Sequence, residues 1–236
     1  LWLLLEFRNG DKDLAIERRA WIHSAQPDNL ENSLEYARCL LQLRRLDEAR
    51  IVIDAVTAVL AKEGSNKSAL QPLNMLRAAL GGANGDVAAS LTEFTKLVES
   101  IPENRREAAC VDFAELVKTL GGSDLVLKVL DLGRKYQDPQ YARIERLLGD
   151  MYFSMSDWDK ARASYDRARD MVPVDEDKLL LKRSIECLMK AKNFDEARKL
   201  IDTEGGDKSR DVQILLLGAQ LEFARGDRPK GLQLLD

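Results

Sequence analysis

The sequence predicts an all-α protein built from repeated antiparallel helix pairs. Leucine and alanine together number 63 of the 236 residues, whereas valine, isoleucine and threonine together number 26. This balance is typical of helices and excludes an all-β fold. A short acidic motif also recurs down the chain, and apolar residues follow helical spacing on both sides of every copy. The repeat therefore predicts hairpins that stack one after another in an array.

The recurring motif joins an acidic turn to the start of a helix. Residues 46–50 read Leu-Asp-Glu-Ala-Arg, residues 158–162 read Trp-Asp-Lys-Ala-Arg, and residues 194–198 read Phe-Asp-Glu-Ala-Arg. With weaker copies included, the aligned positions are Ala15, Ala49, Ser90, Asp124, Ala161, Ala197 and Gly231. Three of the six intervals between them are 34 residues long. The alignment predicts units over residues 1–29, 30–65, 66–102, 103–139, 140–175, 176–210 and 211–236.

Prolines, polar stretches and glycines punctuate these units in order. Pro27, Pro102 and Pro173 are expected to close the first, third and fifth units, because proline has no amide with which to continue a helix. The polar residues 62–68 predict a longer loop between the second and third units. Two glycines at 121–122 mark the turn of the fourth unit.

The two ends of the chain lack the polar caps that usually close a repeat array. The sequence begins at Leu1 without an initiator methionine, and the first unit lacks most of its first helix. Asp236 falls inside the second helix of the last unit. We therefore expect residues 1–236 to form a single array that is a piece of a longer one.

The fifth unit carries the most complete pattern. Its patterned residues are Leu148, Gly149, Tyr152, Trp158, Ala161, Tyr165, Ala168 and Pro173. At these positions the chain resembles the tetratricopeptide repeat family, and the resemblance continues in weaker form over essentially the whole sequence. It implies a right-handed α-solenoid. Within each hairpin, small residues such as Gly149 and Ala161 are expected where two helices approach closely, with Tyr165 filling the space beside them.

The resemblance also implies where a partner binds, because first helices in this family line the concave side of the superhelix and recognise peptides. Transferred to this sequence, that geometry places Arg38, Arg106, Phe113, Arg143, Arg146, Asp150, Phe153, Lys182, Glu186 and Met189 in the groove, with Leu179, Gln213, Gln220 and Phe223. Such a groove is basic with apolar islands. The expected partner is a protein or peptide that is acidic and carries apolar anchors. The alternative interpretation is that these are ordinary solvated residues.

Composition limits the other classes of ligand. The chain has 36 basic and 40 acidic residues, and a net charge of -4 argues against a nucleic-acid or anionic-membrane surface. No apolar run approaches the roughly 18 to 20 residues that a membrane span needs. Cys39, Cys110 and Cys187 are far apart, which predicts free buried thiols and favours the cytoplasm. The single histidine, His23, excludes a multi-histidine metal site, and no cofactor is expected.

The leading hypothesis is a non-catalytic scaffold for protein–protein interaction. The alternative is a recognition arm of a larger enzyme, such as a glycosyltransferase, or of a secretion or export assembly, with the chemistry outside this chain. Catalysis within these residues is not expected, because no nucleophile, base and oxyanion donor can be assembled from the sequence. One subfamily binds C-terminal carboxylates through lysine and asparagine, but Arg146, Asp150 and Arg183 stand at those places, so that activity is not predicted.

Overall fold

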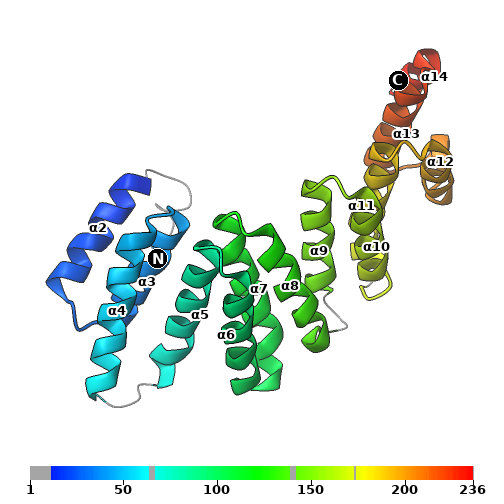
Figure 1. Ribbon diagram of the computed structural model, residues 1–236. Helices are drawn as coiled ribbons and strands as arrows, with labels where there is room; N and C mark the ends of the chain where they lie inside the picture. Colours follow the sequence, from blue (N-terminus) through cyan, green and yellow to red (C-terminus); the bar gives the residue numbers. More distant parts are fainter. Residues whose placement is uncertain (1–11, 64–66, 139–141, 173, 236) are drawn as a thin grey trace. The chain divides into compact units, whose positions relative to one another are not determined.

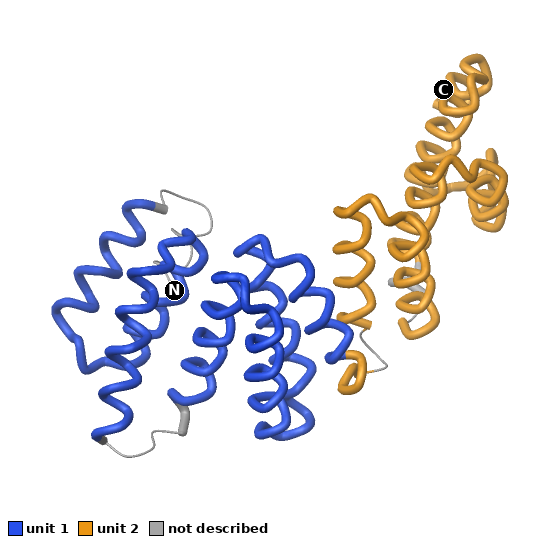
Figure 2. The backbone as a smooth tube through the Cα atoms, viewed as in Figure 1, with its two compact units in different colours: residues 1–133 blue, residues 134–236 orange. Residues whose placement is uncertain are grey.

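The computed structural model describes residues 12–63, 67–138, 142–172 and 174–235 (Figure 1). Within these residues the chain forms thirteen α-helices and two short 3-10 helices, and it contains no β-strand. The predicted fold class, an all-α solenoid of antiparallel helix pairs, is confirmed. The helices fall into two compact units, coloured separately in Figure 2.

Unit 1 comprises residues 1–133. Its helices are α2 (Lys12–Ala25), α3 (Leu30–Gln42), α4 (Leu46–Glu63), α5 (Lys67–Ala83), α6 (Val87–Ser100), α7 (Glu103–Thr119) and α8 (Ser123–Gly133). The pairs that pack most closely are α3 with α4, α5 with α6, and α7 with α8. We call α3, α5 and α7 the first helices of unit 1, and α4, α6 and α8 its second helices.

Unit 2 comprises residues 134–236. Its elements are η1 (Arg134–Tyr136), α9 (Arg143–Ser154), α10 (Trp158–Arg169), α11 (Val174–Lys190), α12 (Phe194–Thr203), η2 (Gly206–Lys208), α13 (Val212–Arg225) and α14 (Arg228–Gln233). Its first helices are α9, α11 and α13. The sequence predicted one array, and it gave no sign of the division after Gly133, which lies inside the unit expected over residues 103–139.

Two of the three predicted proline stops can be checked. Helix α2 ends two residues before Pro27, and α6 ends two residues before Pro102, whereas Pro173 lies outside the described residues.

The prediction of a long loop over residues 62–68 is largely wrong. Helix α4 runs to Glu63 and α5 begins at Lys67, so only residues 64–66, which are not described, separate the two helices.

Six helices begin with a polar side chain that accepts a hydrogen bond from a backbone amide of the first turn. These capping residues are Asn29, Asp86, Asp157, Asn193, Asp211 and Asp227. Each replaces one of the partners that the first turn of a helix lacks, and such a cap contributes about 1 kcal/mol. At Asp157, for example, Oδ1 accepts from the Lys160 amide at 3.4 Å.

The hairpin of α9 and α10 depends on a close approach at Gly149. A methyl group added there would lie 2.4 Å from Cε1 of Tyr165, so the tyrosine ring packs directly on the backbone of α9. The Tyr165 hydroxyl donates to Oδ1 of Asp150 at 2.7 Å. Burial and this hydrogen bond both raise the pKa of the hydroxyl. In the last hairpin the roles are exchanged, because a methyl group at Gly231 would lie 2.5 Å from the ring of Phe223.

Replacing Ala161 with leucine should lower the free energy of unfolding by about 1 to 3 kcal/mol, because the added atoms enter a filled helix crossing. Ala161 is 0% exposed and packs with Tyr165. Thermal and urea unfolding measure the effect. Ala163→Leu is the matched control on the same helix, since Ala163 is exposed. Equal unfolding curves for the two variants would contradict the assigned close contact.

Candidate functional site

The first helices of unit 2 carry four sets of equivalent residues, separated by the repeat intervals of 36 and 34 residues. The sets are Arg143 with Leu179 and Gln213, Arg146 with Lys182 and Leu216, Asp150 with Glu186 and Gln220, and Phe153 with Met189 and Phe223. All twelve residues are exposed or partly exposed. We call this surface the first-helix face of unit 2. Leu216 is the one member that the sequence analysis missed, although the 34-residue interval from Lys182 points to it.

Apolar side chains reach solvent on this face. Leu179 is 61% exposed, Leu216 is 44% exposed and Phe223 is 40% exposed. Met189 is partly buried and packs against the cluster that joins α11, α12 and α13. Exposed apolar groups beside polar ones are typical of surfaces that bind another protein.

An aromatic pair lies between α9 and α10. Phe153 meets Trp158 edge to face, with ring centroids 5.0 Å apart. The guanidinium carbon of Arg183, on α11, lies 5.8 Å from the Phe153 centroid, and Arg183 also pairs with Glu186 at 2.9 Å. Glu186 is therefore already bound to a cation of its own helix, and Phe153 is partly covered.

The predicted groove cation Lys182 is committed to the protein itself, and this part of the prediction needs correction. Its Nζ lies 3.0 Å from Oδ2 of Asp211 and donates to Oε1 of Gln213 at 2.8 Å. The side chain is only 15% exposed. The hydrogen bond from Lys182 lowers the pKa of Asp211. Lys182 thus ties α11 to the start of α13 and offers little charge to a partner.

Three other cations are exposed on or beside this face. Arg143, Lys178 and Lys190 are exposed, and none of their side chains forms a hydrogen bond or an ion pair with another described residue. Arg146 is partly exposed. The predicted Asp150 is exposed, but one of its oxygens accepts the bond from Tyr165. The exposed cations on or beside this face are therefore Arg143, Lys178 and Lys190, whereas Lys182 is bound within unit 2.

The first helices of unit 1 enclose a pocket of about 260 Å³ that includes Arg38. Its lining residues are Leu34, Glu35 and Arg38 from α3, Gln71, Pro72, Met75 and Leu76 from α5, and Arg105, Asp112 and Leu116 from α7. Two cations and two carboxylates line it, so this pocket does not favour one sign of charge. Apart from Arg38, the sequence analysis missed all of these residues.

Two predicted groove residues of α7 do not face the pocket. Phe113 is 0% exposed and stacks on Phe94 with ring centroids 4.0 Å apart. Arg106 donates to the carbonyl oxygens of Glu99 and Ile101 at 3.1 Å each and so closes the end of α6. The prediction was wrong because the alignment placed α7 one residue out of register, which rotates a helix by about 100°.

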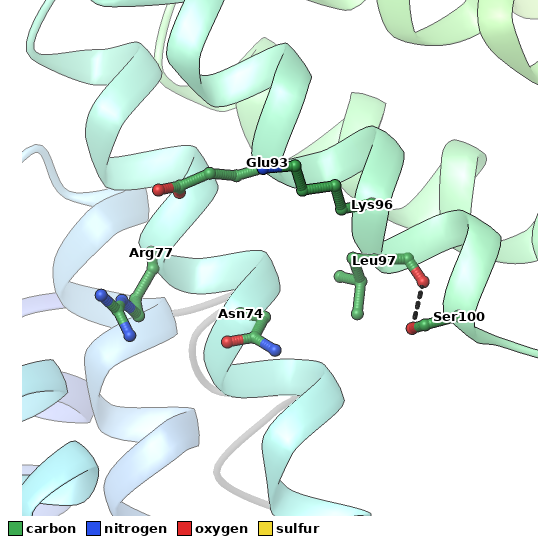
Figure 3. Close-up of a pocket in the computed structure, with 6 residues that line it drawn as sticks. All are labelled: Asn74, Arg77, Glu93, Lys96, Leu97 and Ser100. Atoms are coloured by element: carbon green, nitrogen blue, oxygen red, sulfur yellow. Dashed lines mark hydrogen bonds between the residues drawn. The ribbon is translucent and has the colours of Figure 1, made fainter.

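Two further pockets, of about 290 and 350 Å³, lie on the second-helix side of unit 1. The smaller one is lined by Asn74, Arg77, Glu93, Lys96, Leu97 and Ser100 (Figure 3). The larger one extends past Arg50, Asp54 and the turn that precedes α6. Arg77 and Glu93 line both pockets, so the two form one continuous groove.

Two carboxylates of unit 2 are buried, which is unusual for an ionised group unless it is paired. Glu145 is held by Arg134 at 2.7 Å and by Arg167 at 3.1 Å. Glu222 is held by Arg198 and by Lys230, each at 3.1 Å. Because two cations neutralise each carboxylate, both hold helices together rather than serving as an exposed acid or base.

The described residues contain no cluster of three or more His, Cys, Asp and Glu side chains that could hold a metal ion. His23 instead shares a hydrogen bond of 2.9 Å with Ser33. None of the described helices combines the length and the apolarity needed to cross a membrane. The three cysteines are free and buried, and burial raises the pKa of Cys39 to about 11 and that of Cys110 and Cys187 to about 12.

Stacked helix pairs with exposed faces define a helical-repeat protein. The chain matches the family model "Tetratricopeptide repeat-like domain" over residues 15–190, and it belongs to that family. Proteins of this family are generally non-catalytic, and the fold suggests a scaffold for protein–protein interaction.

Solved structures with a similar fold share little sequence with this chain. The pilF protein of Pseudomonas aeruginosa is 15% identical, with 89% of this chain and 90% of that chain covered and a TM-score of 0.46. A tetratricopeptide repeat protein from Parabacteroides merdae is 15% identical, with 98% and 87% covered and a TM-score of 0.43. The TPR2AB domain of yeast Sti1, in its complex with pHSP90, is 16% identical, with 89% of both chains covered and a TM-score of 0.36. No curated protein matches the chain.

The folded protein should react very slowly with an aromatic disulfide reagent at pH 8. A raised thiol pKa keeps each cysteine protonated, and burial keeps the reagent away. Reaction should speed up only as the pH rises toward 11, the value for Cys39, or when the chain unfolds. Absorbance of the released thiolate follows the reaction, with the urea-unfolded protein as the control. Rapid release from the folded protein at pH 8 would show that these thiols are accessible.

Proposed function

We propose that the first-helix face of unit 2 binds an acidic segment of another protein that carries apolar side chains. The proposal gives a finer description of the interaction scaffold that the family suggests. It rests mainly on one observation, which is that Arg143, Lys178 and Lys190 are exposed and have no side-chain partner among the described residues, on helices that also expose apolar side chains or pack beside one that does. It applies equally to a free-standing scaffold and to an arm of a larger enzyme or of an export assembly.

The cations select the partner and the apolar residues hold it. An exposed ion pair contributes about 0.2 to 1 kcal/mol and weakens as salt rises, whereas burying one large apolar side chain contributes roughly 1.5 to 3 kcal/mol. Leu179, Leu216 and Phe223 are the groups with the most area left to bury. Arg143, Lys178 and Lys190 attract a negatively charged segment and speed its encounter with the face.

Contacts within unit 2 support a narrower set of residues for this role. Lys182 and Glu186 are held by partners within unit 2, so they orient the surface rather than select a ligand. Phe153 is partly covered by Arg183, which leaves the exposed edge of the Phe153 and Trp158 pair as a smaller contact. The pocket around Arg38 in unit 1 has a balanced charge, so it does not share the preference for acidic partners.

Replacing both Arg143 and Arg146 with glutamate should weaken binding of an acidic apolar peptide by about tenfold or more at low salt, because attraction becomes repulsion. The probe is a fluorescent synthetic peptide of Glu-Phe-Glu-Leu repeats, measured by anisotropy with the intact chain. A second peptide with glutamine in place of every glutamate reports the contribution of charge.

The matched control reverses Lys62 and Lys118, which are exposed in unit 1 and line none of the three pockets described above. Both double variants change the net charge equally, so only a local effect can separate them. Unchanged affinity in the first variant, equal loss in both, or no binding of the acidic peptide to the wild-type chain would reject this surface.

A further inference from the structure

The second-helix side of unit 1 contains a groove that takes no part in the proposed peptide binding. It runs over α5 between α4 and α6 and consists of the two pockets that share Arg77 and Glu93. Buried apolar residues, Ile53, Leu80 and Leu97, lie along it. A depression with an apolar base and a charged rim has the anatomy of a protein-binding surface.

The charges of this groove do not neutralise one another within the chain. Arg50, Arg77, Lys96, Asp54 and Glu93 line the groove from α4, α5 and α6, and among the described residues none of the five forms an ion pair or a side-chain hydrogen bond. Figure 3 shows Arg77 and Glu93 approaching the same opening from neighbouring helices, with no bond between them. Both signs are present in nearly equal number. The groove therefore complements a surface that also carries both signs.

A large apolar side chain stands next to the groove. Ile51, on α4, is 69% exposed, and its neighbours Arg50, Ile53 and Asp54 line the larger pocket. A projecting side chain beside a recess of about 350 Å³ makes a surface that is complementary to itself. Under a two-fold rotation, the projection of each copy meets the recess of the other.

We propose that a second copy of this chain covers the groove, so that two chains associate through the second-helix sides of unit 1 about a two-fold axis. Ile51 of each copy enters the larger pocket of the other. Arg77 of each copy pairs with Glu93 of the other, since these two residues occupy the centre of the groove. The balanced charge of the groove supports a second copy as the occupant. A partner selected by charge alone would need charges of one sign on the groove, such as the exposed cations of unit 2.

The association is measured by sedimentation velocity of the intact chain over a range of concentrations. Ile51→Glu should weaken it by about tenfold or more, because an interface is most sensitive to the loss of a buried apolar anchor. Ile51 is exposed in the single chain, so its replacement should leave the melting temperature unchanged at concentrations where both proteins are monomeric. Val212→Glu in unit 2 is the matched control, since Val212 is 76% exposed and does not line the groove.

Charge reversal tests the pairing directly. R77E and E93R should each weaken self-association, because every copy then meets a like charge at both central contacts. An equal mixture of the two variants should associate as well as the wild-type chain, since Glu meets Arg at both contacts of the mixed dimer. A wild-type chain that sediments as a monomer at every concentration would overturn the proposal. So would a dimer that Ile51→Glu leaves intact, or a mixture that is no stronger than its components.

Discussion

The structure depends on how closely two helices of a hairpin can approach. At Gly149 no side chain separates the backbone of α9 from the ring of Tyr165, and Ala161 on α10 is completely buried at the same crossing. Because the core is already filled, an added methyl group must displace a ring or a backbone. The distance between the helices sets which side chains each hairpin buries, and therefore which ones remain on the outer surfaces for partners.

The sequence predicted the hairpins well where the close approach of two helices requires particular residue types. Glycine, alanine and tyrosine in the fifth unit, together with the recurring acidic turns, were sufficient to predict the helix pairs of unit 2. Helix α7 lacks this pattern, and its weaker motif allowed a shift of one residue. That shift placed the buried Phe113 on the surface and hid Asp112, which lines the pocket.

Other features could not be predicted because they depend on distances between side chains far apart in the sequence. Lys182 and Arg183 are adjacent cations in the sequence, yet one joins Asp211 and the other lies over Phe153. Arg106 is a cation that closes a helix end through backbone carbonyls. The sequence shows which residues are cations, but only the structure separates cations that hold the fold together from those that can meet a ligand.

The six helices that start with their own capping side chain have a consequence for how the chain folds. Each cap lies within three residues of the amide it binds, so the signal that starts a helix is local. Contacts between sequential hairpins are also short in sequence, and chains rich in such contacts fold quickly and without a single obligatory nucleus. Folding of either unit can therefore begin in more than one hairpin and spread to its neighbours, so that no individual hairpin controls the rate.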